Sequence, residues 1–189
     1  MSGADLLAQW GDHLALGRRR SPHTVRAYLG CASRLIAGTG ATDWAALTAL
    51  DARDLRVHLA NRRAEGIGNV SAARELSDIR KFLEFAREQS GQGDKAGPRL
   101  RGPRIKKGLP RPVTPDDASN IVDLVEDAAS EPWIGARDRA VLLLLYGAGL
   151  RIAEALSLTG AALPLGEVLT VTGKGGKQRV VPLLPVVRE

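Results

Sequence analysis

Apolar residues in the first half of the chain recur at intervals of three and four positions, which is the spacing of one helix face. The pattern predicts four amphipathic helices, and the short stretches between them predict that these helices pack as a small bundle. Their expected inward faces are, in chain order, Leu6, Leu7, Trp10 and Leu14; Val25, Tyr28, Leu29, Ala32, Leu35 and Ile36; Leu55 and Leu59; and Leu76, Ile79, Phe82, Leu83 and Ala86.

Residues that favour helix ends mark where these helices begin and stop. Ser21 stands directly before a proline, a pair typical of an N-cap and a first helical position, and Gly38 predicts the end of that second helix. Asp51 predicts the start of the third helix and Ser71 the start of the fourth, because both side chains accept hydrogen bonds from unpaired backbone amides. The bundle is expected to occupy residues 1–97.

The second half of the chain opens with further helical signals. Thr114, followed by a proline and two aspartates, predicts a helix start. Two more helices are expected over 136–146 and 151–158, separated by a glycine break. The residues expected to face the core of these helices are Ile121, Leu124, Val125, Ile152, Ala155 and Leu156.

The pattern then changes from helical to extended. The β-prone runs 168–172 and 179–182 flank a glycine-rich stretch, which predicts a β-hairpin. Residues 114–189 therefore read as the beginning of a mixed helix-and-sheet domain. We expect its hairpin and its apolar run 140–145 to be incompletely covered.

The stretch between the two halves is basic and rich in proline. Residues 98–113 contain four prolines and six basic side chains but no acidic one, whereas the whole chain has a net charge of +6. Proline disfavours helix, so the segment is expected to be an extended linker. Charge concentrated in this way is typical of polyanion binding, and a solvated linker is the alternative interpretation.

The composition excludes several classes of protein. Hydrophobic residues make up 44% and charged residues 25%, a balance typical of a folded globular chain. The longest apolar run is far shorter than the ~20 residues that cross a bilayer. Cys31 is the one cysteine and the three histidines are scattered, so neither a disulfide framework nor a metal site is predicted. We expect a cytoplasmic protein with no membrane segment, no metal and no cofactor.

Two motifs remain as candidates for chemistry. Arg151 follows the glycine break in YGAGLRIAEAL, where its planar guanidinium suits phosphate oxygens; an exposed arginine at a helix start is the alternative. Lys174 stands at the tip of the predicted hairpin in VTGKGGKQRVVPL, where it could enter a DNA groove and donate a proton to a leaving oxygen. An ordinary turn lysine is the alternative there.

These two motifs, in this order, resemble those of the tyrosine site-specific recombinases, and the Xer branch of chromosome-dimer resolvases most of all. SPHTVRAYLG and SAARELSDIRKFLEFA resemble the second and fourth N-terminal helices of that family, and RIKKGLPRPVTPDDA resembles its linker. The resemblance implies a mainly α chain. It would hold a four-helix SAM-like core-binding domain over 1–97, a linker over 98–113, and over 114–189 the first part of a mixed α+β catalytic domain with a β-hairpin.

The resemblance also implies a mechanism and roles for particular residues. In this family a tyrosine attacks the scissile phosphate of duplex DNA, without a metal or cofactor, and the enzymes work as tetramers with a paralogous recombinase. Arg151 matches the first catalytic arginine and Lys174 the hairpin lysine, the general acid. The residues expected to contact the DNA backbone, with a structural role as the alternative for the last two, are Arg104, Lys106, Lys107, Lys177 and Arg179.

The rest of the family pattern, a His-x-x-Arg, a later His or Trp and the nucleophilic tyrosine, should follow Lys174, but the sequence after Lys174 contains none of these. His23-Thr-Val-Arg26 has the His-x-x-Arg spelling, but it precedes Arg151 and is interpreted as a coincidence. Tyr28 and Tyr146 have apolar helical spacing and are expected in the core, so no nucleophile is predicted. We therefore expect a C-terminally incomplete recombinase that is inactive alone. The alternatives are a non-catalytic DNA-binding fragment, a remnant of a phage or mobile-element integrase, and a basic helical protein that binds acidic partners or RNA.

Overall fold

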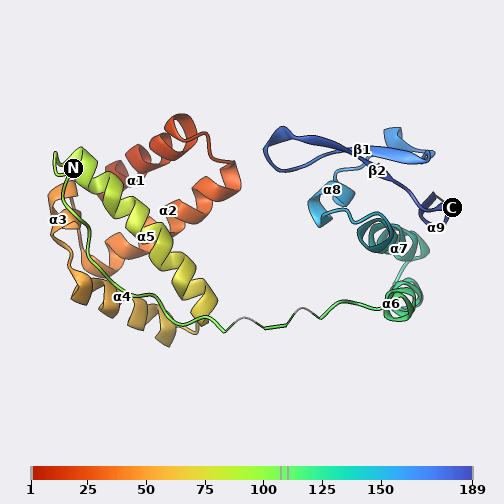
Figure 1. The fold of residues 1–189 in the computed structure, drawn as a ribbon, viewed down its shortest axis with the longest axis horizontal. Helices are drawn as coiled ribbons and strands as arrows, with labels where there is room; N and C mark the ends of the chain where they lie inside the picture. Colours follow the sequence, from red (N-terminus) through yellow and green to blue (C-terminus); the bar gives the residue numbers. More distant parts are fainter. Residues whose placement is uncertain (1, 107, 110, 189) are drawn as a thin grey trace. The chain divides into compact units, whose positions relative to one another are not determined.

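The computed structural model describes residues 2–106, 108–109 and 111–188, and the chain divides into two compact units, Met1–Gly108 and Leu109–Glu189 (Figure 1). The first unit is helical, and the second combines helices with a two-stranded antiparallel sheet. Among the described residues, no helix has both the length and the apolar character needed to cross a membrane. The division into units falls inside the basic segment 98–113.

The described part of the N-terminal unit has one more helix than the sequence pattern predicts. Its α-helices are α1 (Gly3–Asp12), α2 (Pro22–Thr39), α3 (Trp44–Ala49), α4 (Ala52–Ala64) and α5 (Asn69–Gln89), with a π-helical turn at His13–Gly17. The unpredicted helix is α3, which is too short to show a periodic pattern. Asp43 caps it by accepting a hydrogen bond from the Ala46 amide at 2.7 Å.

Two of the four expected helix boundaries in this unit are wrong. Ser21 and Asp51 cap α2 and α4 as predicted, each accepting hydrogen bonds from amides of the first turn. Ser71, however, lies inside α5, which begins two residues earlier after Gly68. Gly38 does not end α2; the helix continues to Gly40, whose φ of +70° is the left-handed conformation that terminates a helix.

The predicted inward faces form the core of the N-terminal unit. Helix α5 crosses the unit and packs against α2, α3 and α4 (Figure 1). Leu6, Trp10, Leu35 and Phe82 are among the side chains buried there. Leu100, from the basic segment, joins the same core, and its carbonyl accepts a hydrogen bond from Arg80. The first residues of that segment therefore belong to the N-terminal unit.

In the second unit the predicted hairpin is confirmed. The described α-helices and strands are α6 (Pro115–Asp127), α7 (Pro132–Gly147), α8 (Ile152–Leu156), β1 (Val168–Thr172), β2 (Gln178–Pro182) and α9 (Pro185–Arg188). Strand β1 pairs with β2 antiparallel, in the register that sets Val168 opposite Pro182 and Thr172 opposite Gln178. Thr114 caps α6 as expected, whereas α7 begins at Pro132, four residues before the predicted start.

Several residues expected in the core of this unit are exposed. Val122 is the buried residue of α6, whereas Ile121 and Leu124 face solvent. Ala155 is buried in α8, whereas Ile152 and Leu156 are exposed. Helix α6 packs mainly against α7, and a helix with one neighbour buries a narrower strip than its apolar pattern offers.

The apolar run 140–145 and the two tyrosines are less buried than core residues would be. Within Ala140–Leu145 of α7, only Leu144 is buried. Tyr146, expected in the core, is half exposed, and Tyr28 is partly buried against the core of the N-terminal unit. The core of the second unit consists of Leu144, Leu150, Ala155, Val171, Val181, Leu183 and Val187.

Candidate functional site

A single buried carboxylate joins α8 to the hairpin in the second unit. The guanidinium of Arg179 on β2 donates two hydrogen bonds to Glu154, Nη1 to Oε1 at 2.6 Å and Nη2 to Oε2 at 2.7 Å. Arg151 donates from its Nη1 to Oε1 at 2.9 Å and from its backbone amide to Oε2 at 2.9 Å. Glu154 therefore brings the start of α8 and the hairpin to one place.

Local sequence explains why Arg151 and Glu154 meet. Gly149 adopts a φ of +61°, which lets the chain turn sharply after α7. Arg151 then takes the N-cap position of α8 with extended backbone, and Glu154 stands at the third helical position. A side chain there reaches back to the N-cap amide, as in a capping box.

The hydrogen bonds of Glu154 fix its charge. Donation from Arg179, and then from the backbone and side chain of Arg151, lowers the pKa of Glu154 from 4.5 to about 2. In turn, the carboxylate raises the pKa of Arg179. Glu154 is therefore ionised at neutral pH and holds two guanidinium groups close together.

The turn of the hairpin passes directly against this ion cluster. A Cβ placed on Gly173 would lie 3.1 Å from Oε1 of Glu154 and 3.6 Å from Nη1 of Arg151. Residues Lys174–Gly176 form the tip, where Gly175 and Gly176 have φ of +78° and +73°. Lys174 directly follows Gly173, whose added Cβ would lie beside Arg151. The side chain of Lys174 lies outside what the structure describes.

The other predicted site residues differ in exposure and partners. The side chain of Arg151 is 67% exposed, so its guanidinium is open to an external phosphate. Arg179 uses both terminal nitrogens on Glu154, which fits the structural alternative for this residue. Lys177 is exposed on the hairpin.

In the basic segment, Arg104 and Lys106 are exposed, and the Arg104 carbonyl accepts a hydrogen bond from Asn69 at 3.3 Å. Lys107 lies outside the described residues.

Glu154 was missed by reasoning from the sequence. Its distance of three positions from Arg151 is the signal that could have found it, once α8 is known to begin there.

A second ion cluster lies in the N-terminal unit. Glu75 on α5 accepts hydrogen bonds from Arg62 at 3.0 Å and Arg34 at 3.4 Å, and its Oε1 lies 3.1 Å from Nε2 of His58. Burial by itself would raise the pKa of Glu75, but the bonds from Arg62, His58 and Arg34 outweigh it and lower the pKa. The cluster ties α2 and α4 to α5.

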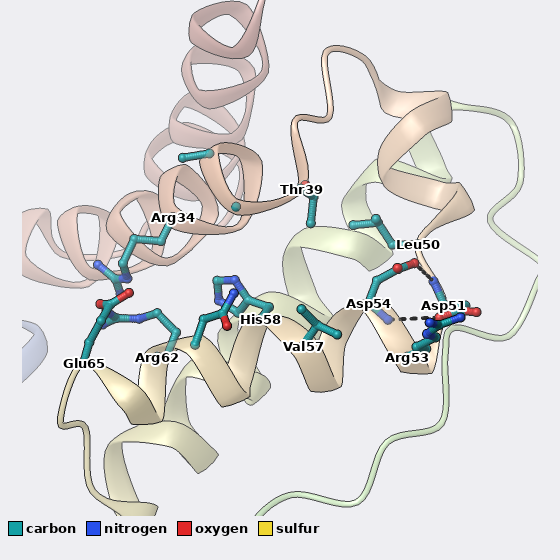
Figure 2. A pocket seen from close by; sticks show the side chains of 13 residues that line it. Arg34, Thr39, Leu50, Asp51, Arg53, Asp54, Val57, His58, Arg62 and Glu65 are labelled. Carbon is teal, nitrogen blue, oxygen red and sulfur yellow. Dashed lines mark hydrogen bonds and ion pairs between the residues drawn. The ribbon is translucent and has the colours of Figure 1, made fainter.

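Arginines line two hollows on either side of that cluster. One is a cavity of about 830 Å³ between the end of α2 and α4, in which His58 and Arg62 on α4 lie near Arg34 (Figure 2). The other is a groove of about 430 Å³ between α2 and α5, lined by Arg26 and Arg74 in addition to Arg34 and Arg62. Arg26 and Arg74 are exposed, as groups that bind a polyanion must be.

Across residues 2–106, 108–109 and 111–188, no three His, Cys, Asp or Glu side chains gather in a way that could hold a metal ion. The groups that do gather are guanidiniums around carboxylates. Such guanidiniums suit phosphate esters.

Comparison with known proteins finds relatives along most of the chain. Residues 7–90 match the family described as the phage integrase N-terminal SAM-like domain, and residues 112–189 match the phage integrase family. Tyrosine recombinase XerC of Rhodospirillum centenum is 40% identical over 195 residues, which cover 98% of this chain and 56% of that protein. XerC of Mesorhizobium japonicum is 45% identical over 188 residues, with 94% and 59% covered. The chain thus spans less than two thirds of the length of these relatives.

Solved structures show the same fold. A lambda integrase dimer bound to a COC′ core site has a TM-score of 0.65 at 19% identity, covering 95% of this chain and 48% of that chain. The XerH recombinase bound to a palindromic difH substrate has a TM-score of 0.59 at 16% identity, covering 96% and 54%. The expected fold class, mainly α with a SAM-like N-terminal domain and a β-hairpin, is confirmed. The chain belongs to the phage integrase family of tyrosine recombinases.

Proposed function

We propose that the chain serves site-specific recombination of double-stranded DNA, by strand cleavage and rejoining through a phosphotyrosine. The observation that carries this proposal is the contact of Glu154 with both Arg151 and Arg179, because it brings the start of α8 and the hairpin together. A phosphodiester beside the exposed guanidinium of Arg151 would also lie near the hairpin tip that bears Lys174.

Each of the two proposed catalytic residues has one task. During attack on phosphorus, negative charge grows on the non-bridging oxygens, and the Arg151 guanidinium stabilises it by hydrogen bonding. The bond from phosphorus to the 5′ oxygen then breaks, and the Lys174 ammonium donates the proton that this oxygen needs. Glu154 is a positioning residue, because it holds Arg151 and does not face the phosphate itself.

We expect this chain alone to form no covalent bond with DNA. Its two tyrosines do not match the nucleophile of the family: Tyr28 lies in the N-terminal unit, where its hydroxyl accepts a hydrogen bond from Lys81, and Tyr146 lies in α7. Incubation with a nicked duplex that carries a recombination site should give no adduct on a denaturing gel. A tyrosine-linked adduct would contradict the prediction that neither Tyr28 nor Tyr146 is the nucleophile.

Double-stranded DNA is the proposed partner of both units. The groove between α2 and α5 exposes Arg26 and Arg74, and the basic segment adds exposed Arg104 and Lys106. If the six basic residues of the segment each met a phosphate, they would contribute about −5 to the slope of log Kobs against log salt. Those six residues are Arg99, Arg101, Arg104, Lys106, Lys107 and Arg111.

A triple substitution tests the role of the basic segment. Arg104→Gln, Lys106→Gln and Lys107→Gln together should reduce the steepness of the salt dependence by about 3, because three phosphate contacts are lost. The matched control removes the same charge from other exposed arginines, by Arg53→Gln, Arg137→Gln and Arg188→Gln. Equal slopes for the two triple variants would exclude a contact of the segment with DNA.

Chromosome-dimer resolution in the cytoplasm, in a tetramer with a paralogous recombinase, is the specific role that we propose. It is supported by the XerC relatives at 40% and 45% identity. Integration of a phage or mobile element is the second candidate, favoured by the fold likeness to lambda integrase. Binding competition between a dimer-resolution site and a phage attachment site would separate the two roles.

A further inference from the structure

The four arginines that line the groove between α2 and α5 differ in how they are held. Arg26 and Arg74 are exposed, and neither makes a hydrogen bond to another described residue. Arg34 and Arg62 both donate to Glu75, a buried residue of α5. The side chain of Arg62 is 16% exposed, whereas that of Arg34 is 41% exposed. Arg34 therefore combines a fixed side chain with an open surface.

Two of the three nitrogens of the Arg34 guanidinium are engaged inside the protein. Nε donates to Oε1 of Glu75 and Nη2 donates to Oε2, both at 3.4 Å. Nη2 also donates to the sulfur of Cys31, one helical turn earlier on α2, at 3.3 Å. A planar guanidinium that is held through two of its nitrogens has a defined direction.

The third nitrogen, Nη1, is left for the groove. Among the described residues, Nη1 of Arg34 makes no hydrogen bond. A Cβ placed on Gly30 would lie 3.4 Å from Nη1, so this nitrogen lies over the glycine one turn earlier on α2. Gly30 lines the groove between α2 and α5 and is absent from the lining of the cavity between α2 and α4. Because glycine has no side chain, Nη1 stays uncovered on the groove side.

Glu75 is itself held from a third helix. Nε2 of His58 lies 3.1 Å from Oε1 of Glu75, and Nε of Arg62 donates to the same oxygen at 3.0 Å. Both of these partners stand on α4. The carboxylate is thus fixed independently of Arg34, and through it α4 sets the direction of an arginine that α2 carries.

A single free terminal nitrogen suits a phosphate oxygen better than a base edge. Arginine recognises guanine through two parallel hydrogen bonds to O6 and N7, which require two neighbouring free nitrogens. Arg34 does not offer that pair, because its Nε and Nη2 are engaged by Glu75 and Cys31. One nitrogen can still donate to one backbone phosphate, a contact that positions DNA without reading its sequence.

We propose that Glu75 is a positioning residue for DNA binding, which holds Arg34 so that its Nη1 donates to one backbone phosphate in the groove between α2 and α5. Glu75 does not touch the DNA, because its buried carboxylate accepts from Arg34, Arg62 and His58. The inference rests on the proposed function and adds that one negative side chain strengthens binding to a polyanion. Charge counting alone predicts the opposite sign.

Removal of the Arg34 guanidinium tests the phosphate contact. Arg34→Gln should weaken binding of a mixed-sequence duplex about tenfold and make the slope of log Kobs against log salt shallower by about 1. The loss should be equal for two duplexes of different sequence, because a phosphate carries no sequence information. Arg53→Gln removes the same charge from an exposed arginine at the cavity between α2 and α4, and should keep the slope of the unaltered chain.

Arg34→Lys separates a positioned charge from charge alone. The variant keeps the charge, and the exposed position makes it compatible with the fold. An ammonium is a single donor group, so beside Glu75 it pairs with the carboxylate and has no second nitrogen to present to the groove. Arg34→Lys should therefore bind DNA as weakly as Arg34→Gln. Full affinity in either variant would overturn the proposal.

Glu75→Gln tests the positioning role through the sign of its effect. This variant should weaken duplex binding about threefold or more, although it makes the protein more positive. Glu84→Gln is the control, because it removes an equal charge from an exposed position of the same helix, and should bind at least as tightly as the unaltered chain. In the Arg34→Gln background, Glu75→Gln should cause no further loss, since Glu75 acts through Arg34. Circular dichroism checks folding, and Arg34→Lys decides the case alone if Glu75→Gln is unfolded.

Two further outcomes would overturn the positioning role. One is a Glu75→Gln chain that binds DNA as tightly as Glu84→Gln, and the other is additive losses for Arg34→Gln and Glu75→Gln. Both leave the recombination function standing, because the unaltered chain still binds the duplex. An unaltered chain that binds no duplex would contradict that function, and this inference with it.

Discussion

At the scale of residues, Glu154 shows how one carboxylate can organise a site without facing the substrate. Glu154 accepts hydrogen bonds from two guanidiniums and one backbone amide, so its negative charge is balanced within the protein. Arg151 remains 67% exposed and keeps donors for a phosphate. The sequence motif identified Arg151. Its partner Glu154 could be identified only once the start of α8 was known, because that start places Glu154 at the third helical position.

The low pKa of Glu154 predicts how the second unit responds to acid. Its folded value of about 2 lies below the ordinary 4.5, so its stabilising effect is complete above pH 4.5 and is lost as pH falls through about 2. Glu154→Gln should lower the melting temperature at neutral pH and flatten this acid dependence. Melting curves from neutral pH down to about 2 measure both effects.

Glu167→Gln is the matched control, because Glu167 is 88% exposed and its ion pair with Arg188 is long, at 3.9 Å. That variant should keep the melting temperature and acid profile of the unaltered chain. Identical acid profiles for Glu154→Gln and the unaltered chain would show that the Arg179–Glu154–Arg151 cluster does not stabilise the fold.

At the scale of elements, the hairpin is placed by its turn as much as by its strands. Gly173 lies where any side chain would meet the ion cluster, and Gly175 and Gly176 take left-handed conformations at the tip. These glycines let the backbone pass beside Glu154 and reverse within a few residues. The turn thereby sets where Lys174 stands relative to α8.

Adding one methyl group tests this placement. Gly173→Ala should destabilise the chain by ~1–3 kcal/mol, because its Cβ would lie 3.1 Å from Oε1 of Glu154 and displace the paired carboxylate. Gly160→Ala is the control, since no atom lies within 4 Å of the added carbon and its φ is not in the left-handed region. Denaturant unfolding compares the two; equal stabilities would refute the close approach.

The elements that the sequence predicted share a strong local signal. The inward faces of α2 and α5 and the hairpin follow from periodicity and turn residues, and all are confirmed. Helix α3 was missed because six residues are too few for a period. The predicted faces of α6 and α8 were wrong in part, at Ile121, Leu124, Ile152 and Leu156, because burial depends on which neighbour packs there. The roles of Arg151 and Lys174 came from the motif resemblance and remain predictions.

At the scale of the whole molecule, each unit has its own hydrophobic core. The core of the first unit includes Leu100, which lies within the segment expected to be a linker, and the units divide between Gly108 and Leu109. The interdomain role of 98–113 stays a prediction. Leu100, near the start of that segment, packs in the core of the first unit, whereas Arg104 and Lys106 are exposed.

Removing the buried leucine tests that structural role. Leu100→Ala should destabilise the N-terminal unit by ~2–4 kcal/mol, because the side chain is 9% exposed and packs in the core. Leu109→Ala is the control, since Leu109 is 91% exposed, and should change stability by about 0.5 kcal/mol or less. Equal denaturation midpoints for the two variants would mean that the segment does not pack on the first unit.

A double-mutant cycle tests most directly whether Arg151 and Lys174 act on one phosphodiester. Binding of a duplex that carries a recombination site is measured for the unaltered chain, Arg151→Gln, Lys174→Gln and the double variant. Two groups that share a phosphate should show a coupling energy of ~0.5–3 kcal/mol. Additive losses, within about 0.3 kcal/mol, or full binding by all four proteins, would contradict a shared site.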